Sequence, residues 1–375
     1  MKRIFLVFFL GTVILLGAIN FSCSKAVINN NSGVTDTVLL NIGNNIILPS
    51  YDSLAIAADS LDSAVVDFNA NPTAAKLSNV QALFITAYTA WQSASPYDHL
   101  GPASVAQPPL SSINIFPVTT TQVDNDISQN NDNVNSFANT TAKGFPALDY
   151  LLFGTNNTTL LTDYTTDALA ANRRAFLAAV AADIKAEANA VYLQWFGGSY
   201  VTTFVNGSGT SVSSSLGLLL NSLDQDFEVL KNDRLGIPLG IIPAGSSSPQ
   251  APTEVEAYYS GISVQLAVKQ LKAIQGIYLG TYQQGNGLGL NTYLTHAEQQ
   301  NHLNYHGGLL SDTIKADFTL ALSDLQAIPD PLSANLSNAN TTAAFTEIQQ
   351  LVTLLKTDMP SDLGVLINYG DNDGD

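Results

Sequence analysis

The chain has 375 residues, of which 12% are charged, and its 31 acidic against 14 basic residues give a net charge of −17. This balance argues against binding to nucleic acids and against docking on anionic lipids through charge. The single cysteine excludes an intrachain disulfide, so the fold must depend on its hydrophobic core. Because the charged share is about half the usual one, the surface must be rich in Asn, Thr, Ser and Gln, which favours an exported protein.

Residues 1–22 are predicted to be a secretory signal peptide. Lys2 and Arg3 precede an apolar stretch from Ile4 to Ile19, and residues 20–22 (Asn-Phe-Ser) lead from it to Cys23. We expect Cys23 to become the lipid-bearing first residue of the mature chain. The alternative is an uncleaved anchor helix, which would need about 20 apolar residues to span a bilayer.

The residues that follow Cys23 are polar and read as a tether. We therefore assign residues 23–34 to the lipidated cysteine and a linker between the membrane and the folded part.

Helical periodicity dominates the rest of the chain. Apolar residues recur at steps of three and four around residues 54–68, 264–278 and 314–325, as in helices packed in bundles. We therefore expect an all-α fold of helical bundles. Further helices are expected over residues 73–95, 163–195, 213–233 and 342–357, and the best candidate for a strand is residues 200–205.

Two segments interrupt the helical pattern. Residues 101–118 are rich in Pro and Ser and cannot form a continuous helix, so we expect an extended loop. Residues 236–252 are rich in Pro, Gly and Ser, and we take them as a boundary. The predicted halves are residues 35–240 and 241–375.

The stretch of residues 143–154 carries the main site signal. Pro146 suits the start of a helix and Gly154 its end, and every residue between them except Asp149 is apolar or aromatic. A short helix that is apolar on all sides is buried. Asp149 must therefore be paired, hydrogen-bonded or chemically employed, since an unpaired buried charge is very costly.

The same stretch resembles the signature of the imelysin-like proteins, Gly-x-His-x-x-Glu followed by an aromatic and apolar run. Gly144, Asp149 and the run at 150–153 match this pattern, whereas Pro146 stands at the histidine position and the acid is the shorter aspartate. Other resembling segments follow in the same order, from about residue 35 to the end: 91–92, 101–103, 115–117 with Asp124, 227–231, 235–240, 256–261 and 369–375.

The resemblance implies two bundle-like halves and a cleft bordered by the helix at 144–153. It also implies a bacterial envelope protein associated with iron uptake, in a family that is labelled as metallopeptidases as well. The family-motif site falls on Gly144, Pro146 and Asp149. Six residues in or beside the resembling segments are candidates for the cleft: Trp91, His99, Asp124, Glu228, Lys231 and Glu256.

The residues at the motif give little support to a metal centre. Proline cannot ligate, so a centre of the His-x-x-Glu type loses its imidazole, and no zinc-hydrolase set of three ligands is evident nearby. Asp149 remains a candidate ligand for iron or another divalent metal, and the alternative is an acid that only accepts hydrogen bonds near the helix start.

Two other groups of residues could carry chemistry. Glu298, His302 and His306 would share a face on one continuous helix, but the Asn and Gly residues around them predict a polar loop with exposed histidines. Glu228 and Lys231, three apart, either pair on the surface or lie against the cleft. The final residues 371–375 resemble the opening of a calcium loop, but the acidic-tail interpretation is preferred because such a loop needs about twelve residues.

Together these observations predict a lipid-anchored, non-catalytic envelope protein that acts as a binding or accessory component in the acquisition of iron or an iron-bearing ligand. We expect it to be exported and held through Cys23, in the inner or outer membrane, most plausibly on the periplasmic side of the outer membrane. Its expected partner is an envelope transport or receptor protein. The competing hypotheses are a metallopeptidase and a metal-free scaffold for an outer-membrane partner.

Overall fold

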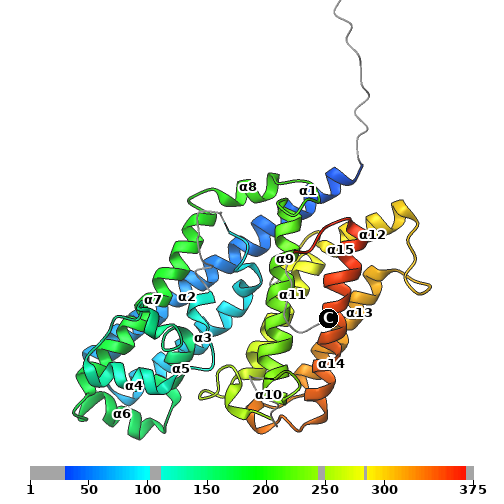
Figure 1. The fold of residues 1–375 in the computed structure, drawn as a ribbon. Coiled ribbons are helices and arrows are strands. Elements are labelled where there is room, and N and C mark those ends of the chain that lie inside the picture. The colour runs from blue at the N-terminus through cyan, green and yellow to red at the C-terminus, as the bar shows by residue number, and fades with distance from the viewer. Residues whose placement is uncertain (1–29, 102–110, 244–249, 283–284, 369–375) are drawn as a thin grey trace, which may run out of the picture.

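The computed structural model describes residues 30–101, 111–243, 250–282 and 285–368 (Figure 1). The signal peptide, Cys23 and the acidic tail therefore lie outside the described residues. Helices dominate the described part, which confirms the all-α prediction, and the strands there form one two-residue antiparallel pair. No helix of the described part is long and apolar enough to cross a membrane.

One group of helices is built around α2 and α3 and is drawn at the left of Figure 1. The helix α2 packs against both α3 and α7, and α5 lies against α3 and α7 as well. The elements of this group and of the chain leading into it are α1 (Asn30–Ile42), η1 (Gly43–Ile47), α2 (Leu48–Ala70), α3 (Ala74–Ala94), η2 (Ser95–Tyr97), η3 (Ser111–Ile113), α4 (Thr120–Gln129), η4 (Phe137–Asn139), α5 (Gly144–Phe153), α6 (Asn157–Thr165), α7 (Ala170–Trp195) and α8 (Tyr200–Asn206).

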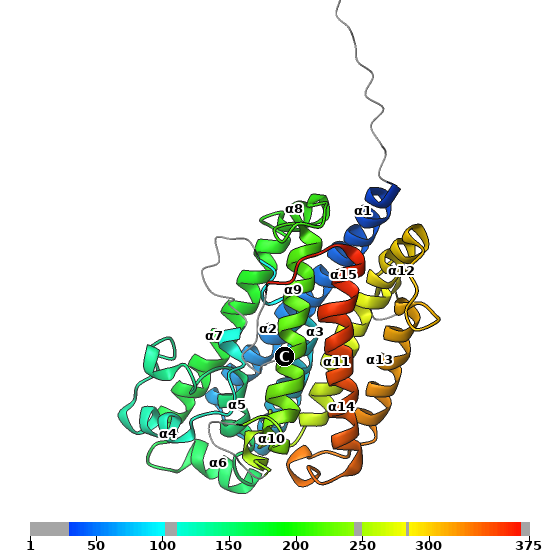
Figure 2. The ribbon, with the colours of Figure 1, turned by 45° about the vertical axis from the view of Figure 1, so that its right-hand side comes forward.

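A second group surrounds α11, which packs against α13 and also against α3 of the first group. In Figures 1 and 2, α9, α11, α13 and α14 run side by side. The elements of this group are α9 (Ser215–Glu228), η5 (Val229–Gly236), α10 (Ile237–Leu239), η6 (Pro252–Glu254), α11 (Ser263–Leu279), β1 (Thr281–Tyr282), β2 (Gly285–Asn286), α12 (Leu290–Asn301), α13 (Leu310–Gln326), η7 (Leu332–Ala334), α14 (Ala339–Thr353), η8 (Leu354–Asp358) and α15 (Met359–Leu363).

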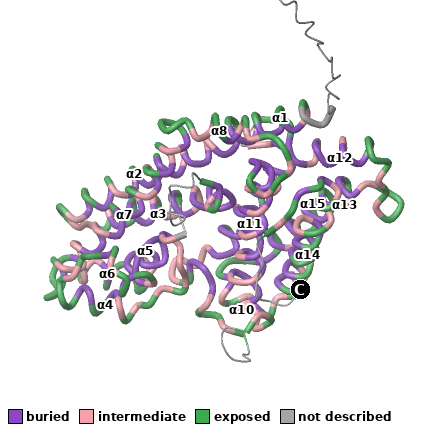
Figure 3. Tube along the Cα trace, turned by 45° about the horizontal axis from the view of Figure 1, so that its top comes forward, coloured by how far each residue is buried: buried purple, intermediate pink, exposed green. Residues whose placement is uncertain are grey.

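The apolar stripes read from the sequence face the interior. Leu54, Leu61 and Phe68 of α2 are fully buried, and the buried positions run through both groups of helices (Figure 3). The helix α3 begins after Pro72, where the Thr73 side chain accepts a hydrogen bond from the backbone amide of Lys76. This cap satisfies one of the amides that a helix start leaves free.

The structure differs from the sequence predictions at three places. Residues 200–205 belong to helix α8 and not to a strand, because burial of Phe204 against Trp195 outweighs the strand propensity of the segment. The helix expected over 163–195 is interrupted after α6, where Asp167 caps the turn that precedes α7. Residues 30–34, which we expected in the tether, are already part of α1.

The division of the chain into halves at about residue 240 stays a prediction. Helix α9 precedes that point in the sequence but lies beside α11 and α14 (Figures 1 and 2). The contact of α3 with α11 brings the two groups of helices together next to the motif segment.

Candidate functional site

The motif glycine is held at a position that no other residue fits. Gly144 starts α5 with a φ of +72°, and a Cβ atom built on it would lie 2.1 Å from the carbonyl oxygen of Ile113. Such a backbone conformation is unfavourable for residues other than glycine. The requirement for glycine therefore comes from the close approach of η3, which ends at Ile113.

Asp149 is buried and links α5 to a distant part of the chain. Its Oδ2 accepts the backbone amide of Tyr259 at 2.8 Å and its Oδ1 that of Ser260 at 2.9 Å, and the residue is 2% exposed. Burial raises the pKa of Asp149 to about 6, although the hydrogen bonds from Ser260 and Tyr259 oppose this shift. The carboxyl group is thus hydrogen-bonded, as the sequence required, and each oxygen accepts a backbone amide.

A pocket of about 240 Å³ opens beside Asp149 and Pro146. Its other walls are residues 116–118, 120, 253–255 and 257–259, so the motif helix, the loop after η3 and the segment from η6 onwards all meet here. We call it the Pro146 pocket. The proline presents no donor or acceptor to it from its side chain.

Asp124 contacts the motif helix through the side chain of Tyr150. The hydroxyl of Tyr150, on α5, donates to both carboxylate oxygens of Asp124 at 3.1 and 3.0 Å, and the ring of Tyr150 lies 5.2 Å from that of Tyr259. Asp124 therefore orients Tyr150 at the edge of the site.

A buried polar network lies next to the motif helix and centres on Glu256, which is 1% exposed. Its Oε1 accepts from Gln92 Nε2 at 3.1 Å and from Asn114 Nδ2 at 2.8 Å, and its Oε2 lies 3.1 Å from Nη1 of Arg234. Arg234 also donates to Gln92, and the Tyr88 hydroxyl donates to Asn114. A buried ion pair is tolerated only with such additional hydrogen bonds.

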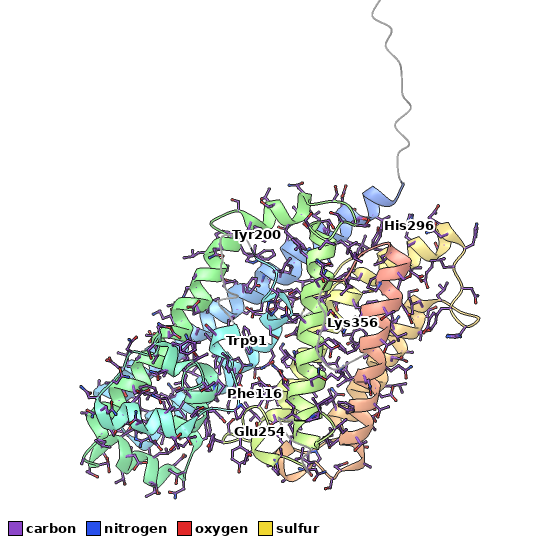
Figure 4. The ribbon with its side chains drawn as sticks, in the orientation of Figure 1. Trp91, Phe116, Tyr200, Glu254, His296 and Lys356 are labelled. Atoms are coloured by element: carbon purple, nitrogen blue, oxygen red, sulfur yellow. The ribbon has the colours of Figure 1, made fainter. Side chains whose placement is uncertain are left out.

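Beside this network lies a second pocket, of about 260 Å³, which we call the Trp91 pocket. Trp91 and Phe116 appear close together in Figure 4, where α3 faces α9. Four buried polar atoms of its lining residues have no hydrogen-bond partner: Nε1 of Trp91, Oγ of Ser95, Nε of Arg234 and Oδ2 of Asp226. A buried group without a partner costs about 1–3 kcal/mol, so these atoms are suited to a ligand that supplies the partners.

Ionisable groups around the Trp91 pocket are shifted towards their neutral forms. Burial raises the pKa of Asp226 to about 6, with Arg234 opposing the shift. Burial also raises the pKa of Asp233, again against Arg234, and lowers the pKa of His99. Asp233 and His99 both line the pocket, together with Asp98. The pocket thus combines hydrogen-bond donors, acceptors and aromatic surface.

The described residues do not fit a metal centre of the His-x-x-Glu type. Both oxygens of Asp149 accept amides of the same chain, and Pro146 brings no imidazole. Within the described ranges, no group of three or more His, Cys, Asp or Glu residues could hold a metal ion.

Glu228 and Lys231 form their pair in the interior and not on the surface. Lys231 Nζ lies 2.8 Å from Glu228, Lys356 lies 3.3 Å from it on the other side, and both members of the first pair are about 2% exposed. The pair joins the end of α9 to η5, and Lys356 adds a contact with η8. Neither Glu228 nor Lys231 lines the Trp91 pocket or the Pro146 pocket.

The shared face that one continuous helix would give Glu298, His302 and His306 does not form. Glu298 is buried and accepts from the backbone of Leu310 and Ser311 at the start of α13. His302 ends α12 in the left-handed conformation, and His306 lies in the loop beyond. The loop interpretation is therefore the one that the structure supports.

The structure thus brings Trp91, His99 and Glu256 to one region, with Asp124 at the edge of the motif helix. Sequence reasoning missed Gln92, Asn114 and Asp226. Gln92 carries a detectable signal, since it follows Trp91 as a polar residue on a mostly apolar helix. Asn114 and Asp226 carry none, because their positions depend on contacts with segments far away in the sequence.

Comparison with known proteins identifies relatives over most of the chain. The family model of imelysin matches residues 47–357. Iron-regulated protein A of Synechococcus elongatus is 21% identical over 318 residues, which cover 81% of this chain and 79% of that protein.

Two crystal structures share the fold. A protein from Parabacteroides distasonis, described as an iron-regulated protein A precursor, superposes with a TM-score of 0.71 at 15% identity and covers 88% of this chain and 95% of its own. An imelysin-like protein from Psychrobacter arcticum gives a TM-score of 0.60 at 16% identity, over 90% of this chain and 98% of its own.

Proposed function

We propose that this chain, which belongs to the imelysin family, is an exported, lipid-anchored envelope protein that binds an iron-bearing ligand and does not cleave peptides. Two relatives that are described as iron-regulated proteins support the part of the proposal that concerns iron. The lining of the Trp91 pocket supports the part that concerns the chemical class of the ligand.

The unpartnered polar atoms of the Trp91 pocket carry the proposal. A bare cation needs several anionic or carbonyl ligands around one point. The pocket instead offers the N–H donors of Trp91 and Arg234 beside the carboxylate of Asp226, together with aromatic surface. This mixture matches a polar organic molecule, so we infer that iron arrives as a chelate.

The motif helix supports a structural role over a hydrolytic one. A metallopeptidase needs a metal with an open position and a positioned water. Asp149 uses both oxygens to hold the segment at Tyr259 and Ser260, and Pro146 cannot replace a histidine ligand. The motif helix would then hold the segment that carries Glu256, whose partners Asn114 and Arg234 line the Trp91 pocket.

The lipid anchor on Cys23 and the position at the outer membrane belong to the same proposal. Their support is the layout of residues 1–23, with a basic start, an apolar core and one cysteine. The partner that we propose is an envelope transport or receptor protein. Labelling with a fatty-acid analogue, lost in Cys23→Ser, tests the anchor, and an unchanged label in that variant contradicts it.

The two tryptophans of the chain allow a direct binding test. In the variant Trp195→Phe, only Trp91 remains, and ferric nitrilotriacetate should quench its fluorescence in a saturable way. In the matched variant Trp91→Phe, which keeps an aromatic ring but loses the Nε1 donor, affinity measured by calorimetry should fall several-fold. Nitrilotriacetate without iron and ferrous sulfate without chelator are the controls.

The outcomes of these experiments distinguish binding in the Trp91 pocket from peptidase activity. Equal affinity in Trp91→Phe and the unsubstituted protein, or no saturable binding of the chelate, contradicts binding in the Trp91 pocket. Cleavage of a protein substrate that a chelator stops and that Asp149→Asn abolishes would establish the peptidase instead.

A further inference from the structure

A third pocket lies on the other side of the end of α3 and belongs to neither the motif helix nor the Trp91 pocket. It has a volume of about 240 Å³ and is bounded by the start of α2, the end of α3, α11 and β1. Ser93 and Tyr97 line it, whereas Trp91 and Ser95, which alternate with them, line the Trp91 pocket. The two pockets therefore open in different directions from one segment.

The charge of this pocket is unusual for such an acidic protein. Lys269 and Lys272 of α11 both line it. Of the eight lysines that the structure describes, five lie within ion-pair distance of a carboxylate, and the remaining three are Lys269, Lys272 and Lys315.

Placing two unpaired lysines three residues apart has a cost. Like charges at this spacing destabilise an isolated helix by a few tenths of a kcal/mol, and here no carboxylate among the described residues offsets them. The chain has 31 acidic residues, yet none of those that the structure describes forms an ion pair with Lys269 or Lys272. Local conflicts of this kind are expected at functional positions.

A buried hydroxyl completes the set of donors. Tyr97 is 1% exposed, and its Oη has no hydrogen-bond partner although Tyr97 lines the pocket. Ser93, which is 4% exposed, lines the same wall. The hydroxyl of Tyr97 is a donor whose burial is costly unless a ligand accepts from it.

We propose that this pocket, which we call the lysine pocket, binds a small oxyanion, namely a phosphate or carboxylate group of a small molecule, through Lys269, Lys272 and the hydroxyl of Tyr97. Two ammonium groups neutralise its charge, and the tyrosine hydroxyl fixes its orientation. The size of the pocket suits a small molecule and not a polymer. This site is independent of the iron chelate proposed for the Trp91 pocket.

Calorimetry on the full chain with Cys23→Ser tests the proposal, with inorganic phosphate in one arm and metal-free citrate in the other. We expect one equivalent of at least one anion to bind, with an affinity that falls as salt increases. The double variant Lys269→Gln/Lys272→Gln should weaken binding by at least about tenfold, because it removes two charge-assisted hydrogen bonds. Tyr97→Phe, which keeps the ring, should weaken it several-fold.

The matched control is Lys315→Gln, which removes one unpaired lysine on α13 outside the pocket and should leave affinity unchanged. Trp91→Phe should also leave it unchanged, so a failure of the iron proposal is distinguishable from a failure here. The proposal is overturned if neither anion binds, if the double variant binds as the unsubstituted protein does, or if Lys315→Gln weakens binding equally. A preference for one anion identifies the ligand as a phosphate or as a carboxylate.

Discussion

The sharpest test of the motif site is the substitution Gly144→Ala. The added Cβ would meet the carbonyl oxygen of Ile113 at 2.1 Å, and the residue would have to keep a φ of +72°. The left-handed conformation costs a residue with a side chain about 1–2 kcal/mol. Forcing apart a packed backbone segment adds about 1–3 kcal/mol, so we expect a total loss of about 2–5 kcal/mol.

The chain offers a matched control at Gly364. This glycine has a φ of +65° at the end of α15, and a Cβ built on it meets nothing within 4 Å. Gly364→Ala should therefore cost only the conformational part, about 1–2 kcal/mol. The difference between the two variants isolates the contact with Ile113.

Urea unfolding followed by far-ultraviolet circular dichroism measures both variants. Gly144→Ala should unfold at a clearly lower urea concentration than Gly364→Ala, with a similar slope. If the two free energies of unfolding agree within about 0.5 kcal/mol, the Ile113 contact does not explain the motif glycine. The requirement for glycine would then have to come from a ligand or a partner.

Three further predictions concern the buried acids. Asp149→Ala leaves the backbone amides of Tyr259 and Ser260 without acceptors and should lower the free energy of unfolding, measured in urea, by about 2–5 kcal/mol. An unchanged free energy of unfolding would contradict the proposed link between α5 and the segment at Tyr259 and Ser260. Because burial raises the pKa of Asp226 from 3.8 to about 6, the unfolded chain releases this proton first as pH rises. Stability from this group should therefore fall by about 3 kcal/mol between about pH 4 and pH 7. In urea unfolding compared across that range, the total fall should be smaller by about this amount in Asp226→Asn, while the contribution of Asp149, whose pKa is also raised to about 6, remains. Glu256→Gln leaves buried Arg234 without its anionic partner and should lower the free energy of unfolding by about 3–5 kcal/mol, measured by thermal or urea unfolding. The control is Glu254→Gln, which should cost little, because Glu254 is half-buried and has no ion pair among the described residues.

Much of the fold could be predicted because helix burial follows local periodicity. The stripe through Leu54, Leu61 and Phe68 has the spacing of one helix face, and the structure buries it. The segment 200–205 was mispredicted because its β-branched and aromatic residues favour a strand in isolation, whereas packing on Trp195 decides the outcome.

The site was predictable only in part, for a different reason. The burial of Asp149 follows from its apolar neighbours, so its need for hydrogen bonds could be stated in advance. Its partners, the amides of residues 259 and 260, lie more than a hundred positions away and donate through the backbone, which carries no sequence signal. Gln92 meets Glu256 across 164 positions and Arg234 across 142, so their network could not be inferred from spacing.

The two departures from the family motif are connected by the chemistry of burial. A glutamate at position 149 would place its carboxylate one methylene further from the backbone of α5, and Pro146 offers no imidazole to pair with it. The shorter aspartate keeps the carboxylate close to α5, where the amides of Tyr259 and Ser260 satisfy both of its oxygens. Once proline occupies position 146, aspartate is therefore the acid that this buried helix can accommodate. The motif then stabilises the contact between α5 and the segment at Tyr259 and Ser260. The N–H donors that remain for a ligand, on Trp91 and Arg234, lie in the neighbouring Trp91 pocket.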